Sequence, residues 1–124
     1  MKKYKFSANE ADKFKKHGIN LTIYKYKEPS STVCRVSVKE GHFQEFYDIA
    51  TTFTYYIISG SGTFILDDKP VLANEGDLIV IPPNTRIHYF GTMEMVLTNS
   101  PEWKEENERH VRFINKSESP YYNT

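Results

Sequence analysis

Cysteine is nearly absent from this sequence, which contains only Cys34, so no disulfide can form within the chain. We therefore expect a reducing, cytoplasmic setting, where structural disulfides are rare. Cys34 lies in the alternating stretch of residues 33–38, which reads as a strand. A small buried hydrophobe fits this position better than a reactive nucleophile does.

Long hydrophobic runs are also missing from the chain. The longest, residues 78–81, is far too short to span a membrane, and no run typical of a signal peptide follows the lysine-rich start. Neither sign of charge is in excess, because 16 Lys and Arg residues balance 16 Asp and Glu residues. Nucleic-acid binding needs a basic face that displaces counterions. We therefore expect no membrane and no nucleic acid among the partners.

The length of 124 residues predicts one domain, 1–124, with a barrel core over about 21–115 and a flexible tail over 117–124. Folding at this length removes roughly two-thirds of the chain's surface from water, which is enough for one core. The sequence has nine Tyr and eight Phe residues, which favour strands. We find no internal repeat and no linker.

The arrangement of short apolar segments and turns predicts an all-β fold. Ser7 is placed to cap a short N-terminal helix that ends near His17 and Gly18. Beyond it, helical periodicity is missing, and short strands alternate with turn residues, as in sandwiches and barrels. The predicted strands are 21–27, 32–38, 53–58, 63–66, 71–73, 78–81, 87–90, 93–99 and 110–114.

Two segments share a spacing of glycines and prolines. The first runs from Gly41 to Gly60, and the second runs from Gly76 through Pro82 to Gly91. This spacing resembles that of the cupin superfamily, whose motifs are G-x5-H-x-H-x3-E-x6-G and G-x5-P-x-G-x2-H-x3-N. The resemblance implies a double-stranded β-helix, also called a jelly-roll barrel.

The residues that bind a metal in cupins are replaced in this chain. Tyr47, Ile49 and Phe53 stand at the ligand positions of the first motif, and Ile87 stands at that of the second. Transition metals bind to imidazole, thiolate or carboxylate groups, and none of these four residues supplies one. We therefore predict no metal and no other cofactor. Asn84 replaces a motif glycine, and asparagine tolerates the left-handed backbone that this turn requires.

A shifted metal site is an open alternative. His42, Glu45 and Asp48 lie close together in the sequence, and His88 follows Ile87 directly. We expect His42 and Glu45 to lie in an exposed loop. Alternation along a strand turns His88 outward if Ile87 faces the interior.

The same alternation selects the residues that face the barrel interior. These residues either fill the barrel as ordinary core or form an apolar cleft with hydroxyl groups at its edge. In the second case the barrel binds a small organic molecule or a sugar. Catalytic residues stay unassigned. The predicted ligand-binding residues are Tyr47, Ile49, Phe53, Tyr55, Ile87 and Tyr89.

Two other functions remain open. Some cupin-fold proteins are metal-free epimerases or isomerases of nucleotide-linked sugars, which use a His as base and a Tyr as acid. His42 or His88 would then act with Tyr47 or Tyr89, an assignment that rests on analogy of fold. Alternatively, the chain is a structural or interaction module with a solid barrel.

Bulky residues are also predicted on the outer surface of the barrel. Monomeric proteins seldom expose a large apolar patch. Cupin-like domains commonly dimerise, so we expect a homodimer. The predicted outer residues are Tyr56, Ile58, Phe64, Leu66, His88 and Phe90.

Overall fold

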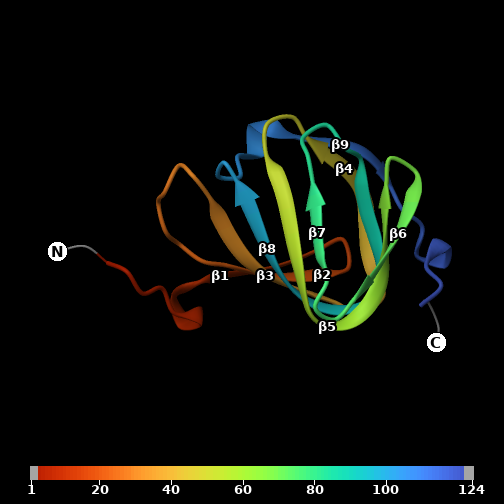
Figure 1. The fold of residues 1–124 in the computed structure, drawn as a ribbon, viewed down its shortest axis with the longest axis horizontal. Coiled ribbons are helices and arrows are strands. Elements are labelled where there is room, and N and C mark those ends of the chain that lie inside the picture. The colour runs from red at the N-terminus through yellow and green to blue at the C-terminus, as the bar shows by residue number, and fades with distance from the viewer. Residues whose placement is uncertain (1–2, 122–124) are drawn as a thin grey trace.

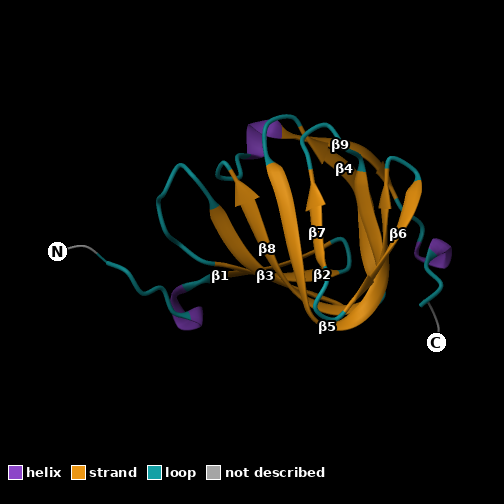
Figure 2. Ribbon diagram, viewed as in Figure 1, coloured by secondary structure: helices purple, strands orange, loops and turns teal. Residues whose placement is uncertain are grey.

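The computed structural model describes residues 3–121, which form a single curled β-sheet (Figures 1 and 2). Helical structure in these residues is limited to 3-10 turns at Ala8–Glu10, Glu105–Asn107 and Lys116–Glu118. None of the described residues forms a helix long and apolar enough to cross a membrane. The strands are β1 (Asp12–Lys16), β2 (Ile19–Ile23), β3 (Thr32–Val38), β4 (Gly41–Asp48), β5 (Thr52–Leu66), β6 (Lys69–Asn74), β7 (Leu78–Ile81), β8 (Ile87–Ser100) and β9 (Glu108–Phe113).

Two long strands, β5 and β8, organise the sheet. They pair antiparallel from Thr52 opposite Ser100 to Leu66 opposite Ile87. Six strands pair in the order β1-β2-β3-β8-β4-β9, and β5 pairs with β6, β7 and β8 (Figure 1). This pairing curls the sheet into a barrel-like shell, as the sequence predicts.

Gly60 allows β5 and β8 to approach closely at the bend. Its φ of 87° is unfavourable for residues with a Cβ atom. A Cβ atom built at this position would overlap the carbonyl oxygen of Thr92 on β8. The glycine that closes the first motif is therefore required both by its backbone conformation and by the neighbouring strand.

Asn84 has the left-handed backbone predicted for it, with a φ of 63°. Its backbone N–H donates to the carbonyl oxygen of Asp48 at 2.8 Å. The carboxylate of Asp48 accepts from the backbone N–H groups of Ala50 and Thr51 at 2.9 and 2.8 Å. Asp48 thus stabilises the turn after β4.

The main core lies inside the curl, where alternate residues of β3, β5 and β8 meet. On β8, the inward positions of Met93, Met95 and Leu97 are all buried. A smaller cluster of Phe43, Phe90 and Ile114 lies apart from the main core. The period of two along each strand therefore sets which side chains meet in the interior.

The predicted N-terminal helix is shorter than expected, because it is only a 3-10 turn at Ala8–Glu10 with Ser7 as its N-cap. Residues 12–16 are strand β1, which pairs with β2 through a tight turn at His17 and Gly18. Both turn residues have positive φ, 49° and 92°. Positive φ at both central residues is typical of a two-residue hairpin, and the sequence reading took this turn for the end of a helix.

Strand boundaries differ where glycines lie inside a strand. The predicted strands 32–38 and 78–81 match β3 and β7, whereas 53–58 and 63–66 are both parts of β5. Likewise, 87–90 and 93–99 are both parts of β8. The pairing of β5 with β8 continues through these glycines, with Gly60 opposite Met93 and Gly62 opposite Gly91. The end of the predicted tail, residues 122–124, lies outside the described residues.

Two further expectations are corrected by burial. His42 and Glu45 lie on strand β4 with exposed fractions of 3% and 1%, so they are not in an exposed loop. Phe64 faces the core, because a register shift between Ile57 and Ser59 changes the alternation along β5. The remaining outer residues divide by burial: Tyr56 is exposed, Ile58 and Leu66 are partly buried, and His88 and Phe90 are buried.

Candidate functional site

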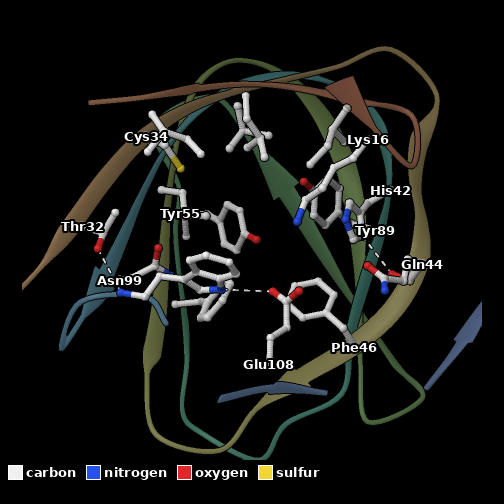
Figure 3. Close-up of a pocket in the computed structure, with 17 residues that line it drawn as sticks. Lys16, Thr32, Cys34, His42, Gln44, Phe46, Tyr55, Tyr89, Asn99 and Glu108 are labelled. Atoms are coloured by element: carbon white, nitrogen blue, oxygen red, sulfur yellow. Dashed lines mark hydrogen bonds between the residues drawn. The ribbon is translucent and has the colours of Figure 1, made fainter. Parts of the chain in front are cut away.

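A cavity opens inside the curl of the sheet, with about 630 Å³ of empty space including its mouth (Figure 3). Its apolar lining includes Phe46, Phe53 and Leu97. The side chains in its wall that carry a nitrogen or oxygen atom are Lys16, Thr32, His42, Gln44, Tyr55, Tyr89, Asn99, Trp103 and Glu108.

Strand alternation places most of these side chains. On β4, His42, Gln44 and Phe46 occupy alternate positions and line the cavity. Strands β5 and β8 add Tyr55 and Tyr89 in the same way. Figure 3 shows Lys16, His42 and Tyr89 gathered on one side and Thr32 and Asn99 on the other, with Tyr55 between them.

His42 is held in one tautomer by a backbone contact. Its Nδ1 lies 2.8 Å from the carbonyl oxygen of Gln44. A carbonyl oxygen only accepts, so Nδ1 carries the proton and Nε2 keeps a free lone pair. The imidazole stacks on the Tyr89 ring, with centroids 5.3 Å apart and planes 21° apart, and meets Phe46 edge-on. These contacts fix both the orientation of His42 and the atom that can take up a proton.

The surroundings of His42 keep its imidazole neutral. Burial and, to a smaller extent, the positive charge of Lys16 lower the pKa of His42 to about 3, although the hydrogen bond to Gln44 opposes the shift. A buried group resists ionisation because the charged form loses its hydration. At neutral pH, His42 is therefore a proton acceptor of low basicity.

Tyr55 and Tyr89 are neutral hydroxyl donors in the same cavity. Burial raises the pKa of both phenols well above the usual value of 10.0. Their rings meet edge to face with centroids 5.7 Å apart. Burial also raises the pKa of the Cys34 thiol to about 12, and Cys34 is buried. The prediction that Cys34 is a buried residue on a strand is confirmed.

Trp103 and Glu108 complete the cavity wall from the C-terminal part of the chain. The backbone N–H of Trp103 donates to Thr32 Oγ1 at 2.9 Å. The indole Nε1–H donates to Glu108 Oε1 at 3.2 Å. The ammonium of Lys16 lies 6.0 Å from the centre of the indole ring. The site therefore has a cation, a carboxylate, a neutral imidazole, two phenols and an indole around one space.

The family model for the cupin domain matches residues 34–98, which is just over half of the chain. The chain belongs to the cupin family. Its curled sheet and its motif glycines agree with this membership.

This cupin is similar to Pac13, for which several structures are known. Streptomyces PAC13 carrying H42Q, with uridine, is 57% identical, with 97% of this chain and 100% of that chain covered and a TM-score of 0.96. A further structure is that of Pac13, described as a unique nucleoside dehydratase, with 57% identity and a TM-score of 0.96. Streptomyces PAC13 has also been solved with uridine as the Y55F and Y89F variants.

A more distant structure shares the fold alone. KdgF from Halomonas sp. is 17% identical, with 85% of this chain and 98% of that chain covered and a TM-score of 0.69. Among curated proteins, no significant match was found.

The six residues predicted to bind a ligand occupy different places in this cupin. Phe53, Tyr55 and Tyr89 line the cavity. Tyr47 is partly buried on β4, and Ile49 follows that strand with 41% of its surface exposed. Ile87 is buried in the main core. Tyr47, Ile49 and Ile87 therefore do not line the cavity. Ligand binding by any of the six residues stays a prediction.

Sequence reasoning did not recognise several residues of the cavity. It assigned His42 to a loop, although the alternation of His42, Gln44 and Phe46 is a signal for a strand. Lys16 lies in the segment predicted to be a helix, so its place in the cavity wall was not recognised. Trp103 and Glu108 come from outside both cupin motifs, where the sequence carries no signal that links them to the barrel interior. The cavity itself argues against a solid barrel.

The four residues of the shifted metal site do not converge. Within residues 3–121, no group of three or more His, Cys, Asp or Glu side chains is arranged to hold a metal ion. Glu45 lies 3.3 Å from Arg86 and from Arg112, and 3.6 Å from His88. The two guanidinium groups therefore balance its charge, while His42 faces the cavity.

The low pKa of His42 predicts a pH-dependent stability. Because the folded-state pKa lies below the unfolded value of about 6.5, the unfolded chain binds the extra proton as pH falls. The contribution of His42 to the free energy of unfolding is therefore fully present above pH 6.5, and it is lost as the pH decreases toward 3. From pH 6 to pH 4, we expect wild type to lose about 1.4 kcal/mol per pH unit more than a His42→Gln variant does.

Urea unfolding of both proteins at each pH measures this difference. The variant serves as the control, because the other titrating groups are common to both proteins. Parallel pH profiles for the two proteins would show that His42 is not held neutral by its surroundings.

Proposed function

We propose that this cupin binds a nucleoside in its cavity and removes water from it, as a dehydratase. The observation that carries the proposal is the grouping of His42, Tyr55 and Tyr89 around one space. The Streptomyces PAC13 structures with uridine carry substitutions numbered 42, 55 and 89, of the same three residue types. An identity of 57% over nearly the whole chain supports carrying the activity of Pac13 to this protein.

Dehydration requires two proton movements, and His42 is suited to both. A base takes the proton from a carbon atom of the sugar, and the freed electron pair forms a C=C bond as the neighbouring hydroxyl leaves. That hydroxyl takes up a proton and departs as water. The Nε2 lone pair of His42 accepts the first proton, and the imidazolium, whose pKa is low, gives the proton to the leaving oxygen.

The two phenols hold the substrate and stay protonated throughout. Burial raises the pKa of Tyr55 and Tyr89, so donating a full proton from either is unfavourable. Neutral phenols still donate hydrogen bonds to sugar or carbonyl oxygens. Lys16, whose positive charge lowers the pKa of His42, supplies a positive charge that stabilises negative charge developing on the substrate.

The low basicity of His42 narrows the substrate class. A base whose conjugate acid has a pKa of about 3 removes only an acidic proton at a useful rate. A C–H bond next to a carbonyl group is acidic, whereas that of an ordinary sugar is not. We therefore expect turnover of nucleosides whose sugar carries a carbonyl group, and binding without turnover for plain uridine.

Calorimetric titration with uridine tests the binding half of the proposal. We expect saturable binding with one site per chain for the wild type. The matched comparison is Tyr56→Phe, which lies on the same strand as Tyr55 but on the exposed face and is expected to bind equally well. Undetectable binding at millimolar uridine by a folded wild-type protein would refute a nucleoside site.

An epimerase or isomerase is the second candidate. Among the pairs of His and Tyr proposed from the sequence, His42 and Tyr89 are in contact, with ring centroids 5.3 Å apart. Such an enzyme would remove the same proton and then return one to the other face of the sugar. Its product has the mass of the substrate, whereas a dehydratase product is lighter by one water molecule.

We further propose that the protein is a cytoplasmic homodimer that works without a metal ion. Exposed fractions of 46%, 58% and 56% at Tyr56, Leu78 and Val80 give β5 and β7 an apolar outer face that supports dimerisation. The side chains at the family's ligand positions support metal independence, and the lone cysteine supports a reducing compartment. A molecular mass of one chain, measured by sedimentation equilibrium, would contradict the dimer.

A further inference from the structure

Asn99 is an unexpected side chain for its position in the barrel. It occupies an inward position of β8, in line with Met93, Met95 and Leu97. Only 3% of its surface is exposed, and it lines the cavity. Its Nδ2 atom has no hydrogen-bond partner within residues 3–121. A buried amide that lacks a partner is unfavourable for folding, so its presence in the cavity wall indicates a role toward a ligand.

The surroundings of Asn99 differ from those of His42. Across the sheet, Asn99 pairs with Thr32 on β3 and with Phe53 on β5. Thr32 in turn accepts the backbone N–H of Trp103, whose ring lies in the cavity wall. Figure 3 shows Asn99 and Thr32 away from the cluster of Lys16, His42 and Tyr89. The cavity therefore has a proton-transfer side and a side with an amide and an aromatic ring.

This division matches the two parts of a nucleoside. The sugar must lie against His42, because the proton transfers take place there. The base is then left for the other side, where an indole ring provides an apolar wall. Uracil presents a carbonyl oxygen beside an N3–H group, an acceptor next to a donor. A carboxamide carries a complementary donor and acceptor on the two atoms bonded to its carbonyl carbon. Rotation of the amide lets either atom face the cavity.

We propose that Asn99 is a specificity-determining residue that recognises the Watson–Crick edge of the pyrimidine base. This inference rests on the proposed function. The amide oxygen of Asn99 accepts from N3–H, while its NH2 group donates to the adjacent base carbonyl. The ligand thereby supplies the partner that Nδ2 lacks among the described residues.

Uridine and 3-methyluridine test this assignment, because methylation removes the N3–H donor. We expect wild type to bind uridine at least about 10-fold more tightly than 3-methyluridine, the range of one lost bidentate contact. In Asn99→Leu, which keeps the size of the side chain, uridine binding should weaken by about 10- to 100-fold. The preference for uridine over 3-methyluridine should shrink to within about 3-fold, since neither nucleoside then has a partner for its edge.

Thr98→Val is the matched control, because Thr98 is the neighbour of Asn99 on β8 but alternates to the other face. It should bind both nucleosides as wild type does. Asn99→Ser replaces Asn99→Leu in the test if circular dichroism shows that the leucine variant is misfolded. The inference is overturned if the Asn99 variant keeps the wild-type preference or loses both nucleosides equally. A wild type that binds neither nucleoside would instead refute the proposed function.

Discussion

Replacing His42 with glutamine is expected to lower the turnover number by about 100- to 10,000-fold, the usual contribution of a positioned acid–base group. Glutamine has a similar extent and can donate to the Gln44 carbonyl oxygen, but it cannot accept a proton at neutral pH. The wall of the cavity thus keeps its shape. We therefore expect uridine to bind to the variant within about 3-fold of its wild-type affinity, because the lost group acts mainly in the reaction.

The control for this variant is His110→Gln. His110 is exposed on β9 and does not line the cavity, and a glutamine there can still accept from Gln44 Nε2, which lies 3.0 Å from His110 Nδ1. Turnover of both variants is followed on a nucleoside substrate that carries a carbonyl group on its sugar, with uridine affinity measured by calorimetry. A His42→Gln enzyme as fast as the His110→Gln enzyme would remove His42 from the mechanism. A large loss of uridine binding with turnover retained would assign it to binding.

The second large effect is expected on stability, at Gly60. Substitution by alanine places a Cβ atom against the Thr92 carbonyl oxygen and also imposes a φ of 87° on a residue that disfavours it. Gly76 has nearly the same φ, 88°, but nothing lies within 4 Å of a Cβ atom there. We expect Gly76→Ala to lose about 1–2 kcal/mol from backbone strain alone. Gly60→Ala should lose about 3–5 kcal/mol, because β5 and β8 must also move apart at this position.

Urea unfolding of the two variants separates these contributions, since the backbone strain is common to both. The difference in their free energies of unfolding reports the close approach of β5 and β8. Equal losses in the two variants would mean that the strands can separate at this bend without penalty. The motif glycine would then reflect only its left-handed conformation.

Much of the fold could be predicted because turns leave strong local signals. The spacing from Gly41 to Gly60 and from Gly76 to Pro82 indicated the cupin barrel, and the left-handed Asn84 was expected. The hairpin at His17 and Gly18 was not expected, because a glycine at such a position can either end a helix or form a tight turn. Only the pairing of β1 with β2 decides between these readings.

The candidate site could be predicted only in part. Counting alternate residues along β5 and β8 placed Tyr55 and Tyr89 in the interior. On β4 the count included Tyr47 but not His42, because His42 was expected to lie in an exposed loop. Trp103 and Glu108 reach the cavity through tertiary pairing of β9 with β4 and through the hydrogen bond to Thr32. Contacts between segments so distant in sequence leave no periodic pattern.

The replacement of the cupin metal ligands also differs from the simplest expectation. Phe53 and Ile87 do face the interior, as apolar residues in place of a Glu and a His. Ile49, however, is 41% exposed, so it does not fill the space of a lost ligand. The nearby carboxylate of Glu45 is instead held by Arg86 and Arg112. The polar groups of the cavity come mostly from positions outside the ligand pattern.

Mass spectrometry of a pyrimidine nucleoside with an oxidised sugar, incubated with the purified protein, tests the dehydratase most directly. We expect a product lighter by one water molecule, formed by wild type and His110→Gln and at least about 100-fold more slowly by His42→Gln. A product of unchanged mass would indicate an isomerase. An unchanged substrate, with a folded wild-type protein that binds uridine, would contradict catalysis of dehydration and leave a nucleoside-binding cupin.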